Sequence, residues 1–416
     1  MATIKPFKAV RPSRDKVGLF ATRTYLSYDK KGLREKLLNN PYTFLQIINP
    51  DFENNKKINK IEKFNLINKE YKSFIKEKIL KKEEQDAFYI YELNHEDRKY
   101  KGIIGATSTE EYYNGIIKRH EKTIEKRESL FTKYLSIINF NADPVLLSYK
   151  SNEVIDNLID QLTSSRSEYE FTTSDKATHK LWVIKNSEKI SKISNEFKKI
   201  DSFYIADGHH RTASSYRLSK EKGPKLFMSF LINEDHINIY SFNRVLIKTP
   251  DFNNKELIIK LKEKFEIKNL DKLSFQSKKE NEILLYYKKK SYSLTPKKGS
   301  YSKNILSALS YSILSNNIIK PIFNLDDNSE KIKYFNGKKN IEHIIKIIDE
   351  TKNSVAFILK PIKIKKIREI ADKNLTLPPK STYIDPKLRS GITILDLKWV
   401  LLKILIIYTE IFQMIL

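Results

Sequence analysis

Residues 203–216 constrain the fold more than any other stretch, because their pattern changes from strand to helix within two residues. Residues 203–206 form an apolar run with the length of a buried strand. Asp207-Gly208 interrupts this run, and glycine permits the left-handed backbone that a turn from strand to helix requires. From His209 onward the apolar residues recur at helical spacing. The stretch therefore predicts a buried strand that leads through a tight turn into a helix.

Three side chains that carry or can acquire positive charge, His209, His210 and Arg211, occupy the first turn of this predicted helix. The first turn exposes backbone N–H groups and the positive end of the helix dipole, so cations are unfavourable there. A bound anion, above all a phosphate, explains their placement. The alternative is a surface turn whose histidines cap the helix or pack. We predict no metal site, because adjacent residues seldom direct both imidazoles at one zinc ion.

Alternating patterns around this stretch indicate an α+β fold, a mixed α/β arrangement of strands and helices. We expect strands at 180–184 and 225–233, and a helix at 188–199 before the central strand. Two further apolar runs, 87–93 and 100–107, flank a polar turn and are expected to pair as strands. Elsewhere, residues 42–48 are expected to form a strand. Residues 109–133 are expected to form one long helix with many i,i+4 charge pairs.

Shifts in composition divide the chain into three parts. Residues 1–250 form an α+β region that carries the Asp-Gly-His-His-Arg motif, and residues 251–394 form a second α+β lobe packed on it. Residues 395–416 form an apolar tail that is interrupted by charges, whereas a membrane span needs about 20 largely uncharged residues. A terminal helix that docks on the protein is therefore expected, with membrane anchoring as the alternative.

Composition excludes several classes of function. The chain has no cysteine, which excludes a disulfide framework, a thiolate nucleophile and cysteine-ligated zinc. Its beginning lacks an apolar run after the first charges, so we expect no secretory signal and a cytoplasmic location without a clear membrane partner. A glycine-rich loop ending in Lys-Ser or Lys-Thr, the Gly-x-Gly-x-x-Gly pattern and the His-Glu-x-x-His pattern are all absent from the sequence.

The formal net charge of +26 raises the question of nucleic acid. The positive residues are mostly lysines spread along the whole chain, whereas basic readers of nucleic acid more often gather arginines and aromatic residues in one patch. The abundance of Lys, Asn and Ile is typical of an AT-rich genome, so we favour compositional drift. Nonspecific binding of nucleic acid is expected in either case.

Other residues supply parts that phosphoryl transfer requires, namely cations, a carboxylate and positioning groups. Asp207 stands beside the predicted phosphate site as a base or a Mg²⁺ ligand. A loop rich in hydrogen-bond donors contains Lys380, Ser381, Thr382 and Lys387, and the predicted long helix contains His120 and Glu121. We expect Lys118, His120 and Glu121, together with Lys380 and Ser381, to line the same cleft. The alternative for His120 and Glu121 is a solvated helix face.

Several ordered motifs make the chain similar to the domain of unknown function 1015 family, over roughly residues 4–392. The motifs that carry the resemblance are Lys5-Pro-Phe7, Asn40-Pro-Tyr-Thr-Phe44, Asp51, Tyr89-Ile-Tyr91, Gly102-Ile-Ile-Gly105, Lys118-Arg-His-Glu121 with Thr123 and Lys126, Tyr204-Ile-Ala-Asp-Gly-His-His-Arg211, Asn243-Arg244, Leu377-Pro-Pro-Lys-Ser-Thr-Tyr383, Pro386-Lys387 and Ser390-Gly391. The family usually shows Pro-Pro-Tyr-Asp-Val near its start. Here only Tyr28-Asp29 survives of that element.

The resemblance implies free-serine kinase activity and a core like the ParB/sulfiredoxin fold, in which a Gly-x-x-Arg at the head of a helix binds nucleotide phosphates. Carried over, Gly208, His209, His210 and Arg211 bind the phosphates of ATP or ADP. Lys380 and Ser381 are also predicted as nucleotide-binding residues. The residues predicted to act in catalysis, with Mg²⁺ as a hypothetical cofactor, are Asp207, His209, His120 and Glu121.

Three hypotheses of function follow. The first is a phosphotransferase that moves a phosphoryl group from ATP to a small hydroxyl compound, with free L-serine as the implied acceptor. The second is a ParB-like nucleotide-binding regulator or DNA-binding protein without enzymatic activity. The third is a relic that folds but has lost its activity, which the altered loop around Tyr28-Asp29 motivates.

Overall fold

The computed structural model describes residues 1–24, 27–52, 58–221, 223–275, 279–338 and 340–398. These residues pack as two units. Unit 1 contains residues 1–119, 123–237 and the described residues from 386 onward, and unit 2 contains residues 120–122 and 238–385. The packing thus divides the chain after Ile237 and after Asp385. The domain boundaries expected after residues 250 and 394 rest on shifts in composition, and they stay a prediction from the sequence.

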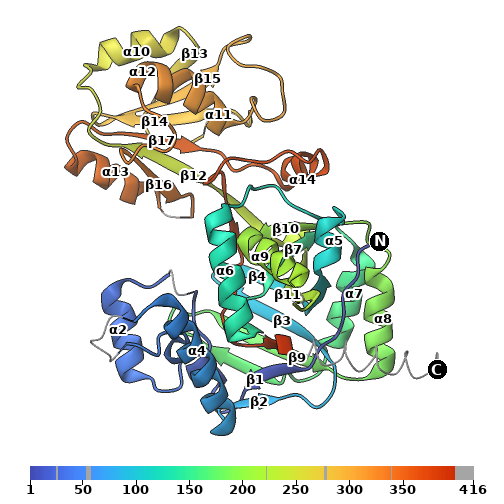
Figure 1. The fold of residues 1–416 in the computed structure, drawn as a ribbon. Helices are drawn as coiled ribbons and strands as arrows, with labels where there is room; N and C mark the ends of the chain where they lie inside the picture. Colours follow the sequence, from blue (N-terminus) through green and yellow to red (C-terminus); the bar gives the residue numbers. More distant parts are fainter. Residues whose placement is uncertain (25–26, 53–57, 222, 276–278, 339, 399–416) are drawn as a thin grey trace. The chain divides into compact units, whose positions relative to one another are not determined.

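Unit 1 is built on an eight-stranded sheet (Figure 1). In spatial order its strands are β5 (Ile117–Lys118), β10 (Phe203–Asp207), β7 (Val145–Tyr149), β11 (Leu226–Asn233), β4 (Arg98–Ser108), β3 (Phe88–His95), β9 (Thr178–Ile184) and β8 (Tyr169–Thr172). The pairs β5–β10 and β7–β11 are parallel, and the other neighbours are antiparallel. The mixed α/β fold class predicted from the sequence is confirmed.

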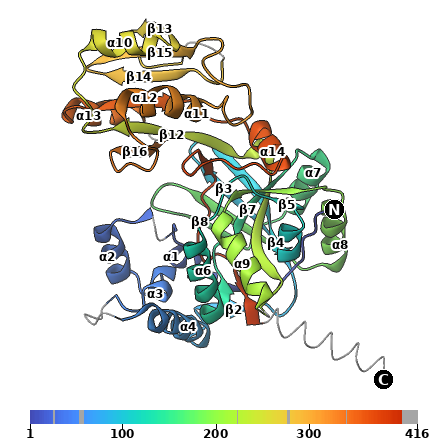
Figure 2. The ribbon, with the colours of Figure 1, turned by 45° about the horizontal axis from the view of Figure 1, so that its top comes forward.

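Two helices, α7 (Glu153–Leu162) and α8 (Ser187–Phe197), cover one face of this sheet. Their apolar residues join those of the central strands in one buried cluster, as the spacing of the apolar positions requires. Two more helices, α6 (Glu125–Ile138) and α9 (His209–Lys220), lie side by side outside that cluster (Figure 2). The remaining helices of unit 1 are α1 (Val17–Phe20), α2 (Lys30–Asn39), α3 (Phe44–Ile48), α4 (Lys60–Lys76) and α5 (Thr109–Tyr113).

A second, four-stranded sheet joins the two ends of unit 1. Its order is β2 (Leu80–Lys82), β1 (Ala9–Pro12), β19 (Ile394–Asp396) and β6 (Phe140–Asn141). Strand β19 pairs with β1 on one side and β6 on the other, so chain that follows unit 2 in sequence completes unit 1. Residues 395 and 396 therefore belong to a strand rather than to the predicted tail helix, because Leu395 and Asp396 are buried in this pairing. The rest of that predicted helix, from residue 399, lies outside the described residues.

Unit 2 has its own antiparallel sheet and its own cores on both faces. The strand order is β13 (Phe265–Leu270), β15 (Lys290–Pro296), β14 (Ile283–Tyr287), β17 (Val355–Leu359), β12 (Asn238–Leu246) and β16 (Ile332–Asn336), and β18 (Thr382–Asp385) pairs with the first half of β12. Its helices are α10 (Asn254–Lys262), α11 (Ser310–Leu314), the π-helix η3 (Ser315–Ile319), α12 (Lys320–Phe323), α13 (Ile341–Glu350) and α14 (Ile364–Asp372). Within the described residues, no helix is long and apolar enough to cross a membrane.

The predicted pairing of residues 87–93 with 100–107 is confirmed by the antiparallel pair β3–β4. The predicted single helix at 109–133 is wrong. Ser108 caps the short helix α5, and Gly115, at φ +75°, turns the chain away after it. Ile117, which is only 1% exposed, then pairs in parallel with β10. Burial of this strand outweighs the i,i+4 charge pairs, because exposed pairs contribute only about 0.3–0.5 kcal/mol each.

The predicted strand at 42–48 is also wrong, because these residues form helix α3. The Oγ1 atom of Thr43 accepts a hydrogen bond from the N–H of Leu45 and caps the helix. Phe44, Leu45 and Ile47 are buried on it. A short apolar run is compatible with either a buried strand or a buried helix, so the polar cap decides between them.

A buried polar cluster fixes the segment after unit 2 to the sheet of unit 1. Arg389 donates from Nη2 to both carboxylate oxygens of Asp175, each at 2.6 Å. Arg389 also donates from Nε to Nε2 of His179 at 3.4 Å. Because arginine can only donate, Nε2 of His179 accepts, and the Nδ1–H group donates to the hydroxyl of Tyr91 at 2.7 Å. Burial, aided by the charge of Arg389, lowers the pKa of His179 to about 3.

This cluster predicts acid sensitivity of the fold. His179 stays neutral in the folded protein, whereas its ordinary pKa in the unfolded chain is about 6.5. Its depressed pKa therefore contributes stability that is complete above pH 6.5 and is lost between about pH 6.5 and 3, with a slope of about 1.4 kcal/mol per pH unit. His179→Asn should flatten this part of the pH dependence in urea unfolding. The matched variant of the exposed His236, His236→Asn, should retain it, and an equal flattening in both variants would contradict the assignment.

Candidate phosphate site at the start of helix α9

The predicted strand, turn and helix are confirmed as β10, Gly208 and α9. Gly208 has φ 104° and ψ 25°, a left-handed conformation that L residues with a side chain rarely adopt. As the N-cap it offers no side chain to the first turn of the helix. The N–H groups of that turn therefore receive no capping hydrogen bond from the N-cap side chain, which is the condition under which a helix start binds an anion.

Asp207, the last residue of β10, forms ion pairs with two cations. Its Oδ2 atom lies 2.6 Å from Nη2 of Arg211, and its Oδ1 atom lies 2.6 Å from Nζ of Lys387. The Asp207 side chain is 37% exposed, so solvent reaches this group. Burial acts to raise the pKa of Asp207, but the charges of Lys387 and Arg211 outweigh it and lower the pKa to about 2. The carboxylate is therefore ionised at neutral pH.

The guanidinium group of Arg211 contacts Asp207 through Nη2 and the main chain before β7 through Nη1. Its Nη1 atom donates to the main-chain oxygens of Asp143 at 3.1 Å and Pro144 at 2.7 Å. The same guanidinium lies against the backbone of Gly208, where a Cβ atom would come within 3.0–3.1 Å of it. Arg211 thus connects Asp207, the turn and the loop before β7. Its predicted contact with nucleotide phosphates stays a prediction.

The two histidines differ in their surroundings. His209 is 7% exposed, and His210 is half-buried. Burial lowers the pKa of His210, and the charge of Arg127 adds to that effect, which favours the neutral imidazole. The Nδ1 atom of His210 is buried and has no hydrogen-bond partner within the described part of the chain. A neutral imidazole offers one N–H donor, so His210 can serve as a single hydrogen-bond donor to an anion.

The other predicted site residues belong to unit 2. The main-chain oxygen of His120 accepts a hydrogen bond from the N–H of Leu377 at 2.7 Å. Glu121 forms an isolated parallel β-bridge with Leu377. Unit 2 therefore brings residues 120–121 beside the start of the loop that holds Lys380 and Ser381. His120 is 1% exposed, so the alternative of a solvated helix face is wrong for it: this residue lies neither in a helix nor in solvent.

Lys380 and Ser381 make contacts within their own loop and sheet. Lys380 has φ +61°, and its Nζ atom lies over the ring of Phe242 at 5.1 Å. Its main-chain oxygen accepts from Arg244 at 3.3 Å. The Ser381 hydroxyl donates to the main-chain oxygen of Pro378 at 2.7 Å and is 5% exposed. These bonds shape the loop, and the predicted roles of both residues in nucleotide binding stay predictions.

Lys387 belongs to the donor-rich loop named from the sequence, but its ion pair with Asp207 was not predicted. The sequence places it in the donor-rich loop, 180 positions from Asp207, and no local pattern connects the two. The available signal was its place in the Pro386-Lys387 motif, directly after the chain re-enters unit 1. Among the residues that the structure describes, no group of three or more His, Asp or Glu side chains is arranged to hold a metal ion.

We expect Gly208→Ala to destabilise the protein in two ways. The left-handed backbone costs about 1–2 kcal/mol with a Cβ atom present, and the new Cβ atom also displaces Arg211. Gly115→Ala is the matched control, because Gly115 has φ +75° but a Cβ atom added there would meet nothing within 4 Å. Urea unfolding should show a larger loss for Gly208→Ala. Equal losses would mean that the contact with Arg211 has no energetic weight.

We expect Lys387→Met to raise the pKa of Asp207, because one of its two cations is removed. The depressed pKa contributes stability that is present above about pH 4 and is lost as the pH falls through about 2. The variant should therefore be less stable at pH 7, and the difference from the wild type should shrink below pH 4. Carboxyl ¹³C NMR titration measures the pKa, and Lys192→Met on the exposed side of α8 should leave it unchanged.

Comparison with known proteins places the chain in a family. The model of the family described as "Protein of unknown function (DUF1015)" matches residues 4–326. No curated protein matches the chain. Among solved structures, a free serine kinase in complex with AMP is 14% identical, with a TM-score of 0.38 over 73% of this chain and 94% of that chain. A conserved hypothetical protein from Pyrococcus furiosus is 14% identical, with a TM-score of 0.37 over 71% and 96%. C-terminally truncated SbnI from Staphylococcus aureus is 11% identical, with a TM-score of 0.37 over 70% and 87%. Because the family model covers most of its length, the chain belongs to the DUF1015 family.

Proposed function

We propose that this protein binds a nucleotide by its phosphates at Gly208–Arg211 and transfers a phosphoryl group to a small hydroxyl compound. The observation that carries the proposal is the Gly208 turn at the start of α9, beside an ionised carboxylate that holds Lys387 and Arg211 in place. Backbone N–H groups, the helix dipole and a lysine ammonium form the combination that recurs in phosphate sites.

The absence of a side chain at Gly208 supports this assignment. A Cβ atom there would occupy the space beside the Arg211 guanidinium, so only glycine keeps both the backbone and the arginine in this arrangement. The Nδ1 atom of His210 is buried and has no hydrogen-bond partner in the described residues, so the proposal uses it as a group that can bond a ligand. We assign the phosphates to the first-turn N–H groups, His210 and Lys387, and we assign Arg211 the role of positioning Asp207.

The low pKa of Asp207 supports one of the two roles considered for it. A general base works best when its pKa lies near the operating pH, and a pKa of about 2 is far below it. As an ionised carboxylate beside the proposed phosphates, Asp207 would instead serve as a Mg²⁺ ligand by exchanging one of its two ion pairs for the metal ion. When bound, Mg²⁺ would neutralise charge on the transferring phosphoryl group.

Another residue must then accept the proton of the acceptor hydroxyl. We assign this role of general base to His209, in the same turn. The acceptor oxygen forms a bond to the terminal phosphorus while the bond from that phosphorus to the nucleotide's bridging oxygen breaks. The hydroxyl proton passes to His209, and the shortened nucleotide leaves with the bond's electron pair. Free L-serine is the first acceptor to test, because the resemblance carried by the ordered motifs implies it.

Incubation of the protein with ATP or ADP, Mg²⁺ and L-serine should yield phosphoserine, detected by ³¹P NMR. Lys387→Met should weaken nucleotide binding in calorimetry by about tenfold or more, since a charge-assisted hydrogen bond contributes about 1.5–3 kcal/mol. Lys346→Gln, on an exposed lysine of α13, should change neither measurement. Failure to bind any nucleotide would refute the proposal.

The second candidate is a nucleotide-binding regulator without catalysis, in line with a ParB-like core. The formal charge of +26 favours it, because such a charge promotes contact with nucleic acid. Nucleotide binding without turnover of any hydroxyl acceptor, together with salt-sensitive and sequence-selective binding of DNA, would select this function over phosphoryl transfer.

A further inference from the structure

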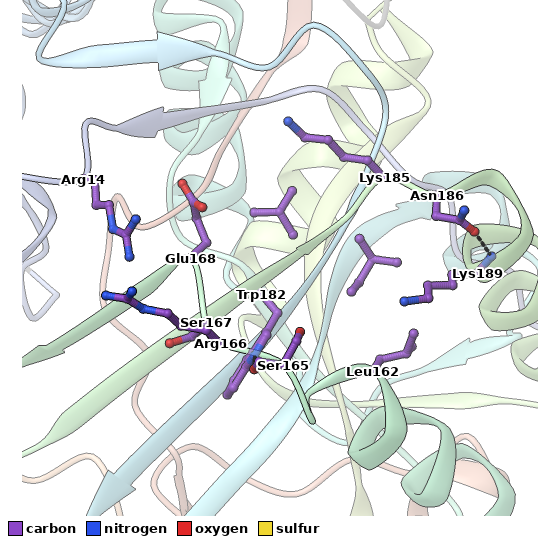
Figure 3. Close-up of a pocket in the computed structure, with 12 residues that line it drawn as sticks. Arg14, Leu162, Ser165, Arg166, Ser167, Glu168, Trp182, Lys185, Asn186 and Lys189 are labelled. Carbon is purple, nitrogen blue, oxygen red and sulfur yellow. Dashed lines mark hydrogen bonds between the residues drawn. The ribbon is translucent and has the colours of Figure 1, made fainter.

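A basic hollow lies at the edge of the unit 1 sheet that is formed by β8 and β9. Its volume is about 500 Å³, and it is lined by the segment before β8, the end of β9 and the start of α8 (Figure 3). Strands β8 and β9 end the sheet on this side, whereas β10, which leads to Gly208, lies next to its other edge. The hollow is thus separate from the candidate phosphate site at α9.

Two arginines dominate one end of this hollow. Arg14 and Arg166 both line this hollow and are drawn on the same side of it in Figure 3, and we call these two residues the arginine pair. An adjoining hollow of about 340 Å³ is also lined by both, so the pair is accessible from two sides. Both side chains belong to exposed residues. Lys185 and Lys189 add positive charge at the other end of the larger hollow.

The carboxylates near the hollow are engaged with other cations. Glu83 pairs with Lys185 at 2.7 Å, and Glu170 pairs with Lys180 at 3.1 Å. Glu168 lies 3.8 Å from Arg11. Neither member of the arginine pair forms an ion pair with a carboxylate of the described residues. Glu168 also lines the larger hollow, and Glu170 lines the adjoining one. The two arginines repel each other as like charges, and a bound anion reduces that repulsion.

The floor of the hollow is rigid and partly apolar. Trp182 is 7% exposed, and its Nε1 atom donates to the main-chain oxygen of Ser165 at 2.8 Å. Leu162 and Ile184 lie beside it in the lining. The volume falls within the roughly 300–1,000 Å³ that is usual for small-molecule sites. The apolar floor and the cationic end of the hollow are together complementary to a molecule that has an organic body and an anionic group.

We propose that this hollow binds a small organic phosphate, with its phosphate on the arginine pair and its organic body on the Trp182 floor. Guanidinium groups bind phosphate oxygens through paired, charge-assisted hydrogen bonds. A phosphate dianion also balances two positive charges, which a halide ion or a single carboxylate does not. The hollow is a binding site for a ligand that differs from the nucleotide proposed at α9. Its limited volume favours a small molecule over a nucleic-acid strand, which requires an extended groove.

Calorimetry with phenyl phosphate tests this site, because that probe has both a phosphate and an aromatic body. The double variant Arg14→Gln/Arg166→Gln should bind it at least about tenfold more weakly than the wild type. The control Arg34→Gln removes an exposed arginine of α2 in the same unit and should leave the affinity unchanged. Inorganic phosphate should bind more weakly than phenyl phosphate, because it makes no contact with the apolar floor.

Other outcomes would overturn the proposal. These are an absence of binding at millimolar phenyl phosphate, or an equal loss in the double variant and in Arg34→Gln. A single-stranded oligonucleotide that binds more tightly than phenyl phosphate, with the same dependence on the arginine pair, would identify a nucleic-acid surface instead. Lys387→Met separates the two sites, because it should weaken nucleotide binding at α9 and leave phenyl phosphate binding intact. Circular dichroism should show that all variants are folded.

Discussion

The ion pairs of Asp207 with Arg211 and Lys387 connect the candidate site to the architecture of unit 1. Arg211 comes from the helix that follows Asp207, whereas Lys387 comes from chain that returns after the whole of unit 2. The same returning segment places Arg389 on Asp175 and the Ser390 hydroxyl on Asp143. Its strand β19 then pairs between β1 and β6. Unit 1 is therefore complete only when this segment is in place.

This arrangement has a consequence for the chemistry. An aspartate at a helix start that keeps two cations within 2.6 Å remains ionised far below neutral pH. Such a group orients positive charge or binds a metal ion well, but it accepts a proton poorly. This is the reason why the proposed function assigns the proton transfer to His209 rather than to Asp207.

Local sequence patterns predicted an element correctly where the residues that determine it lie within the element or its turn. The β3–β4 pair follows from two apolar runs around a polar turn, and the Gly208 turn follows from a glycine between a strand pattern and a helix pattern. They failed where local preference and tertiary burial disagreed. At 109–133 the charges favoured one helix, but burial of Ile117 beside β10 breaks it. At 42–48 a single hydrogen bond to Thr43 selects a helix.

The sequence by itself determined the mixed α/β class, the position of the strand-turn-helix motif and the resemblance to the DUF1015 family. Each of these depends on residues that are close together in the chain or on the order of short motifs. Only the tertiary structure decided that Lys387 reaches Asp207, that Arg211 donates to main-chain oxygens, and that Arg14 and Arg166 line one hollow. Those contacts join residues that are distant in sequence. Side-chain spacing carries no record of such pairings, which arise from the way sheets and returning segments pack.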